Sequence, residues 1–175
     1  LGTGSNGQPL GVITGAATYG ITSTDVSATV SWAAYRAAVT RFMTANAATG
    51  PKSVKALIRP EVWDYLDGVM VGDGGFNFEF DRLAENLGES VMTSNALATP
   101  TSGTPEVTQS LLTTTAGGVA PIFIGAWGAV DMIRDRYSDA QSCGLRITAL
   151  ATLDVTVARA AQLELLTGLE LGVGA

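Results

Sequence analysis

The sequence predicts an α+β protein in which one long helix packs on an antiparallel sheet. In residues 27–47, large apolar side chains recur at three- and four-residue spacing, which aligns them along one side of a helix. These side chains are Trp32, Tyr35, Val39 and Phe42. Residues 145–157 instead alternate apolar with mostly polar positions, as a half-buried strand does. We therefore expect the apolar side of the helix to cover this strand region.

The amino-acid composition argues against several classes of function. The 175 residues are 46% hydrophobic and 15% charged, which is typical of a folded globular protein. The net charge of -6, with 10 scattered basic residues, argues against tight binding along a nucleic-acid backbone. No run approaches the roughly 20 apolar residues of a bilayer-spanning helix, so we expect no membrane partner. Histidine is absent and Cys143 is the only cysteine, which excludes Ser-His-Asp and Cys-His nucleophile systems, the common zinc sites and an internal disulfide.

Three glycines open the chain in the spacing of a nucleotide-binding loop. Gly2, Gly4 and Gly7 spell G-x-G-x-x-G, but the strand before this pattern and the helix after it are missing. We expect a loop with unusual backbone angles and no cofactor. The apolar residues 10–14 that follow are predicted to form a strand.

In the middle of the chain, short apolar runs and the prolines and glycines between them predict the secondary structure. Proline at the first turn predicts a short helix from Pro60. The other expected elements are a strand at 53–58, an extended surface loop at 93–115, a buried strand at 121–125, a brief helix at 126–133, and a break between two strands at Asp154 with the second ending near 166.

Residues 61–89 form an acidic tract, with eight acidic residues and a single base, Arg82. Paired carboxylates such as Glu79 and Asp81 could act as acid and base or hold calcium. Their spacing does not match an EF-hand, and the simpler interpretation is a solvated face with a flexible loop.

The ordered series of motifs resembles the major capsid proteins of tailed bacteriophages, which share the HK97 fold. The likeness covers nearly the whole chain. Residues 2–12 resemble the glycine-rich stretch before the family's central domain, and residues 27–47 resemble its spine helix. Residues 57–63 are similar to its strand-to-helix step, and residues 123–127 resemble its F-G-D-F-type turn. The last two motifs each depart from the family's usual residue, at Arg59 and Ala126.

The resemblance implies the C-terminal portion of such a protein, without the family's N-terminal arm and extended loop. It implies a peripheral domain of residues 1–49 and 137–175 and an axial domain of residues 51–136. It also implies a non-catalytic shell subunit of a phage or prophage capsid that encloses double-stranded DNA without binding it specifically. We expect no catalytic, cofactor-binding or metal-binding residues.

The same resemblance implies the partners and the location. The protein would contact copies of itself in pentamers and hexamers, and also a scaffold, a portal and a prohead protease. It would be made in the bacterial cytoplasm and would lie in the virion capsid.

Two alternatives remain open. An encapsulin-like compartment or a gene-transfer particle would use the same fold, and neighbouring genes would separate these from a phage capsid. A small hydrolase or binding domain that uses the carboxylates of residues 61–89 belongs to another class. It requires a concave pocket where two carboxylates converge and at least one has a strongly raised pKa.

Overall fold

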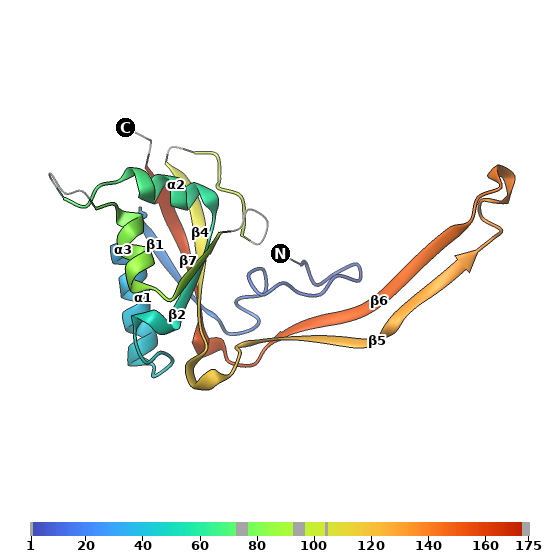
Figure 1. The fold of residues 1–175 in the computed structure, drawn as a ribbon, viewed down its shortest axis with the longest axis horizontal. Helices are drawn as coiled ribbons and strands as arrows, with labels where there is room; N and C mark the ends of the chain where they lie inside the picture. The colour runs from blue at the N-terminus through green and yellow to red at the C-terminus, as the bar shows by residue number, and fades with distance from the viewer. Residues whose placement is uncertain (1, 73–76, 93–96, 104, 173–175) are drawn as a thin grey trace.

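The computed structural model describes residues 2–72, 77–92, 97–103 and 105–172, and it consists of a body and a long projecting hairpin (Figure 1). The body contains a five-stranded mixed sheet in the order β1-β7-β4-β2-β3, and the hairpin is a separate two-stranded sheet of β5 and β6. The strands are β1 (Thr22–Thr29), β2 (Val54–Ile58), β3 (Glu89–Met92), β4 (Glu106–Thr114), β5 (Ile122–Asp135), β6 (Arg146–Val157) and β7 (Leu163–Leu171). The helices are α1 (Trp32–Thr44), α2 (Pro60–Gly68) and α3 (Glu79–Asn86).

The five-stranded sheet is built around β4. This strand runs antiparallel to both of its neighbours, β2 and β7, while β1 is parallel to β7 and β3 is parallel to β2. The prediction of a strand at 53–58 and of a helix that begins at Pro60 is confirmed. The prediction of a surface loop at 93–115 is wrong for Glu106–Thr114, because threonine is a good strand residue and the Thr and Ser side chains here lie inside the sheet.

Helix α1 is shorter than predicted. It spans Trp32–Thr44, whereas residues 27–29 of the expected helix belong to β1, which is held by its parallel pairing with β7. The helix also ends before residue 47, where the sequence predicted its end. Its last turn closes at Asn46, which has a left-handed φ of 54°, and the N–H of Ala47 donates to the carbonyl of Phe42 at 2.8 Å.

The apolar side of α1 is buried as predicted, but against a different partner. Tyr35, Val39 and Phe42 are buried and Trp32 is half-buried. They belong to one core cluster with residues of the central sheet, α2 and α3, among them Val54, Val62, Leu66, Leu83, Leu112 and Leu166. The expected packing against residues 145–157 is wrong, because those residues form β6 in the projecting hairpin.

A second core cluster lies on the opposite face of the sheet. Leu111 and Leu165 belong to it, whereas their neighbours Leu112 and Leu166 belong to the first cluster, as alternation along a strand requires. Residues 11–20 cover this side in a series of turns, so the strand predicted at 10–14 is wrong. The glycine-rich segment has the predicted unusual backbone, with left-handed φ at Gly4, Asn6 and Gly7.

The body unites segments that are distant in sequence. Strands β1 and β7 come from the residues predicted as the peripheral domain, and β2, β3 and β4 come from those predicted as the axial domain. The division into those two domains stays a prediction. Among the described helices, none is long and apolar enough to cross a membrane.

Candidate assembly surface

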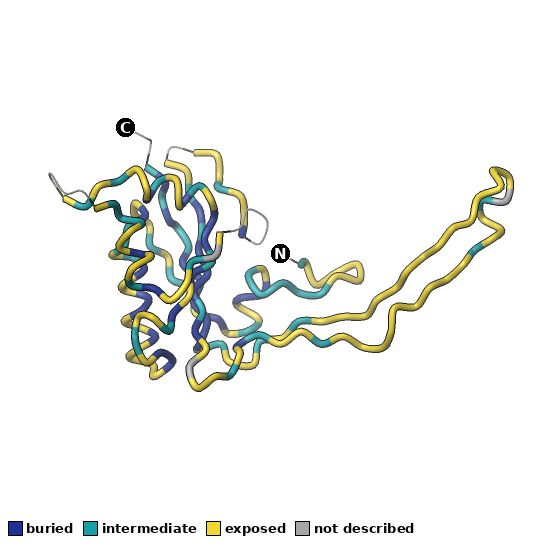
Figure 2. The backbone as a smooth tube through the Cα atoms, viewed as in Figure 1, coloured by how far each residue is buried: buried dark blue, intermediate teal, exposed yellow. Residues whose placement is uncertain are grey.

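The hairpin is the part of the described chain that extends farthest from the body (Figure 1). Strands β5 and β6 pair antiparallel from Ile122 opposite Val157 to Asp135 opposite Arg146. Most of their residues are exposed (Figure 2). The helix predicted at 126–133 is therefore wrong, since a short apolar run does not by itself distinguish strand from helix. The break predicted at Asp154 is also wrong, because Asp154 pairs with Gly125 inside a continuous ladder.

A bulge bends the hairpin at its middle. The register shifts between Trp127 and Asp131, so that residues 128–130 of β5 lie opposite only Ala151 of β6. Gly128 has a φ of +75°, a conformation that costs other residues about 1–2 kcal/mol. Because the bulge adds an even number of residues, the side chains before and after it keep the same faces.

Each side of the hairpin has its own composition, because residues directly opposite in the ladder share a face. We call one side the apolar face, and its residues are Ile122, Ile124, Ala126, Met132, Arg134, Ile147, Ala149, Ala151, Leu153, Val155 and Val157. We call the other side the polar face, where Thr148, Thr152, Asp154, Thr156 and Asp131 are interleaved with Phe123, Trp127, Ile133 and Leu150. On the apolar face Ile124 is 73% exposed, Met132 61%, Ile147 52% and Leu153 49%.

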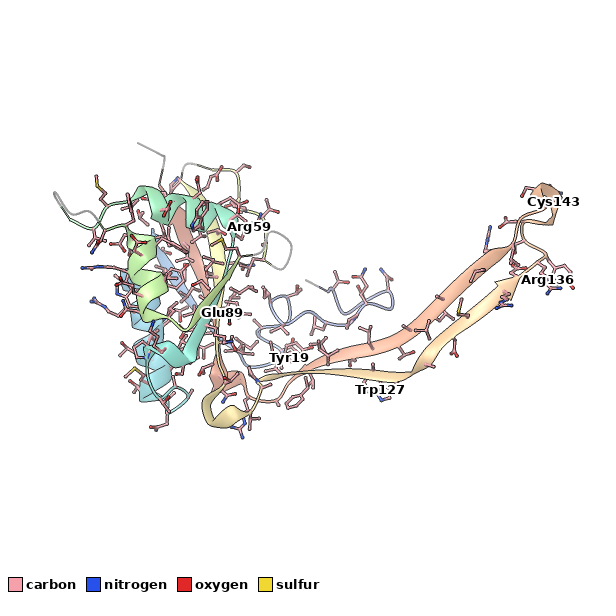
Figure 3. The ribbon with its side chains drawn as sticks, in the orientation of Figure 1. Tyr19, Arg59, Glu89, Trp127, Arg136 and Cys143 are labelled. Atoms are coloured by element: carbon pink, nitrogen blue, oxygen red, sulfur yellow. The ribbon has the colours of Figure 1, made fainter. Side chains whose placement is uncertain are left out.

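The base of the hairpin is anchored to the body. Ile122 and Val157 are half-buried against the second core cluster. The Tyr19 hydroxyl lies 3.0 Å from the carbonyl oxygens of Leu10 and of Val155, to which it donates (Figure 3). The apolar face therefore begins as an extension of a body core and becomes exposed with distance from it.

The tip of the hairpin is closed by a polar turn. The Asp135 carboxylate accepts the backbone N–H of Tyr137 at 2.8 Å and of Ser138 at 3.2 Å, and it also accepts the Ser138 hydroxyl. These hydrogen bonds hold the pKa of the Asp135 carboxyl below its usual value, and the bond from the Ser138 hydroxyl has the largest effect. Arg146 donates twice to the Asp139 carboxylate, at 3.1 and 3.2 Å. Cys143 is exposed at this far end (Figure 3).

The two carboxylates singled out in the acidic tract have structural partners. Glu79 accepts the backbone N–H of Trp32 at 2.8 Å, which joins the start of α3 to the start of α1. Asp81 accepts the backbone N–H of Phe78 at 3.3 Å, just before α3. Both carboxylates thus bind N–H groups at helix N-termini, where negative charge is stabilising.

A cavity of about 810 Å³ beside α2 gathers three carboxylates, those of Glu61, Asp64 and Glu106. Arg59 donates to the Glu61 carboxylate at 2.8 and 3.0 Å and to the carbonyl of Leu97 at 3.0 Å. The hydrogen bond from Arg59 lowers the pKa of Glu61, which is the opposite of what a general acid needs. Among the described residues no group of three or more His, Cys, Asp or Glu side chains is arranged to hold a metal ion.

The comparisons with known proteins find similar structures, whereas the comparisons by sequence find no match. No protein-family model and no curated protein match this sequence. The structure is similar to that of a virus-like particle from Pyrococcus furiosus, with a TM-score of 0.51 and 15% identity over 90% of this chain and 60% of the other. It is also similar to a structure of Mycobacterium phage Che8, with a TM-score of 0.55 and 16% identity over 85% of this chain and 53% of the other.

These two likenesses concern the fold. They support a capsid-type fold of mixed α and β structure for this chain. The chain spans between about half and three fifths of the length of the two structures it matches.

Proposed function

We propose that this protein is a structural shell subunit that assembles with copies of itself. The observation that carries the proposal is the hairpin, which holds large apolar side chains in solvent on a capsid-type fold. Exposed apolar surface of this extent marks an interaction site in a folded protein. The base of the hairpin is fixed to the body, so its surface is presented to a neighbour rather than folded back.

In its finer form the proposal is a tailed-phage or prophage capsid protein of the HK97 type. Its copies would form pentamers and hexamers with peripheral and axial domains, with a scaffold, a portal and a prohead protease as further partners. The likeness to a Mycobacterium phage Che8 structure supports the phage origin and hence a place in the virion. The net charge of -6 fits a shell that encloses double-stranded DNA without gripping its backbone.

A second candidate is an encapsulin-like shell, or the shell of a gene-transfer particle. The likeness to a virus-like particle from Pyrococcus furiosus supports a shell of this kind. The hydrolase alternative has less support, because the pKa of Glu61, a carboxylate that lines the cavity beside α2, is lowered.

Particle formation tests the shell function. The purified protein is followed by light scattering and electron microscopy from dilute to concentrated solution, at low and high salt. We expect concentration-dependent assembly into regular particles or capsomers. DNA that survives nuclease inside the particles would favour the phage capsid over the compartment shell. A protein that stays monomeric under all of these conditions would overturn the shell function.

A further inference from the structure

We infer that residues 2–19, which we call the bracket, set the angle at which the β5–β6 hairpin leaves the body, and that Tyr19 is the positioning residue of this bracket. The inference rests on the proposed shell function, because a hairpin that meets a neighbouring subunit must leave the body at a defined angle. It follows from the length of the hairpin, the hydrogen bonds of Tyr19 and the shape of the glycine-rich loop.

The length of the hairpin makes its base angle important. Strand β5 has 14 residues, which at about 3.3 Å per residue gives a length of up to roughly 45 Å. A rotation of about 10° at the base of such a strand moves its far end by roughly 8 Å. Hydrogen bonds and packed apolar contacts need their atoms within about 4.5 Å, so neither survives a shift of that size. Assembly through any surface of the distal hairpin therefore requires a fixed base angle.

The chain connections at the base leave this angle adjustable. Residues 115–121 lead from β4 into β5, and residues 158–162 lead from β6 into β7. The two connections are joined by the N–H of Ala158, which donates to the Pro121 carbonyl at 2.9 Å. Rotation about the line that joins them changes the direction of the hairpin. A contact farther along the hairpin is needed to stop this rotation, and Tyr19 supplies one at Val155.

Tyr19 ties the hairpin to the glycine-rich loop through one shared hydrogen bond. Its hydroxyl has a single hydrogen and lies 3.0 Å from both the Leu10 carbonyl and the Val155 carbonyl (Figure 3). A cavity of about 320 Å³ lies beside this contact and is lined by Val155, Leu10, Val12, Leu57 and Leu111, among others. The cavity gives the hairpin room to move towards the body if the hydrogen bond is lost.

Glycine lets the loop present the Leu10 carbonyl to Tyr19. The N–H of Gly11 donates to the Gly2 carbonyl at 2.9 Å, which closes residues 2–11 into a loop. A side-chain carbon at Gly2 would lie 2.0 Å from the Pro9 carbonyl oxygen, so a larger residue there displaces Pro9 and the adjacent Leu10. The first glycine of the G-x-G-x-x-G pattern thus allows close backbone packing beside Leu10.

Removal of the hydroxyl tests the positioning role. Tyr19→Phe is compared with Tyr65→Phe, which removes a hydroxyl from a half-buried tyrosine in α2. Single-molecule Förster transfer between dyes on Cys143, at the tip, and on Lys52→Cys, an exposed body position, measures the tip-to-body distance in the dilute protein. Urea unfolding followed by circular dichroism confirms that each body is folded.

We expect Tyr19→Phe to broaden the distance distribution or to shift its centre by roughly 5–10 Å, as a rotation of about 10° would. Amides of β6 near Val155 should exchange roughly two- to tenfold faster, as the net loss of one hydrogen bond predicts. Tyr65→Phe should match the wild type in both measurements. A Tyr19→Phe protein whose distances equal those of the wild type would overturn the inference.

A second pair of variants acts on the bracket and leaves Tyr19 in place. Gly2→Ala displaces the backbone beside Leu10, whereas the control Gly7→Asn meets open space at a φ of 75°, which asparagine tolerates. We expect Gly2→Ala to alter the tip-to-body distance and Gly7→Asn to leave it unchanged. The Gly2→Ala and Tyr19→Phe double variant should change it no more than Tyr19→Phe alone, because both act through one contact. No effect from Gly2→Ala, or full additivity, would contradict the bracket.

These measurements separate the failure of the inference from the failure of the proposed function, because the distances are measured without assembly. If the wild type forms particles but Tyr19→Phe keeps the wild-type distances, the shell function stands and the bracket is wrong. If Tyr19→Phe changes the distances but the wild type never assembles, the bracket sets the angle and the shell function is wrong. If both are right, electron microscopy should show particles of irregular size for Tyr19→Phe and of wild-type size for Tyr65→Phe.

Discussion

Strands of the body and of the hairpin share the same alternation of side chains, but their apolar residues are buried in the body and exposed in the hairpin. In the body, β4 and β7 alternate between two buried clusters, and residues such as Leu112 and Leu166 are inaccessible to solvent. In the hairpin, β6 alternates in the same way, yet Ile147 and Leu153 remain about half exposed. Alternation therefore specifies which side chains share a face, and the surrounding elements decide whether that face is covered.

The difference has a simple structural cause. In the body α1 covers one side of the central sheet, and residues 11–20 cover the other side. Among the described residues, only the base of the hairpin touches these layers, through Ile122, Val157 and the hydrogen bond from Tyr19 to the Val155 carbonyl. The body can thus be stable by itself, whereas the distal hairpin depends on whatever packs against it.

The largest expected effect separates the two regions by stability. Phe42→Ala removes a buried aromatic side chain from the first core cluster and should lower the free energy of unfolding by about 3–5 kcal/mol. The hairpin change Ile124→Ala truncates a side chain that is 73% exposed and should shift it by less than about 0.5 kcal/mol in the dilute protein. Urea unfolding followed by circular dichroism measures both. Equal costs would mean that the hairpin is packed in the isolated chain.

A second prediction concerns alkaline pH and the body core. Burial raises the pKa of Tyr35 from 10.0 to about 12, and a 2.9 Å hydrogen bond to the Ser110 hydroxyl opposes this rise only in part. Because the folded state resists deprotonation of Tyr35, the free energy of unfolding is highest below pH 10.0 and falls as the pH rises towards about 12. The loss attributable to this group should be roughly 3 kcal/mol.

Tyr35→Phe is the control for that titration. The variant lacks the ionisable hydroxyl, so its stability should decline less between pH 10.0 and about 12, although it begins lower because Ser110 loses its partner. Identical pH slopes for wild type and variant would show that Tyr35 does not titrate in this way.

A smaller effect is expected at the ion pair that ties α1 to β7. Glu164 is buried, and its carboxylate accepts two hydrogen bonds from Arg41, from Nε at 2.8 Å and from Nη2 at 2.5 Å. It also accepts the Thr24 hydroxyl at 2.8 Å. Arg41→Met should cost about 1.5–2 kcal/mol, at the lower end for bonds to a charged group because the arginine side chain is 42% exposed. Arg36→Met, on an exposed position of the same helix, should cost less than about 0.5 kcal/mol in the same urea measurement.

The smallest effect on the body is expected at the hairpin bulge. Gly128→Ala forces alanine into a φ of +75°, with a local cost of about 1–2 kcal/mol. This strain should alter NMR shifts along the middle of β5 and β6 and leave the unfolding of the body unchanged. A clear loss of body stability would show that the two regions fold as one cooperative unit.

The sequence predicted the body better than the hairpin, for physical reasons. The spacing of Tyr35, Val39 and Phe42 predicts a buried helix face because 3.6-residue periodicity is a local property. The partner of that face is not local, so packing on residues 145–157 was the wrong inference. Strand β4 was missed because its polar Thr and Ser residues resemble a loop in composition, although three of them are buried.

The hairpin could have been found from a signal in the sequence. Strand β6 was predicted by its alternation, and the turn-forming residues 138–144 before it favour a hairpin with the preceding apolar run. The Trp127-Gly128 step interrupts the alternation of that run, since the bulge adds residues there. A helix at 126–133 was therefore predicted where the structure has a bulged strand.

Hydrogen exchange tests the central claim most directly, because it compares both regions in one sample. Amide exchange is followed by mass spectrometry in the dilute protein and in the assembled protein. We expect the amides of β5 and β6 to exchange much faster than those of β4 and β7 when the protein is dilute, and to become protected on assembly while the body changes little. Hairpin amides that are as protected as those of β4 in the dilute protein, or that gain no protection on assembly, would contradict the hairpin as the surface through which subunits associate.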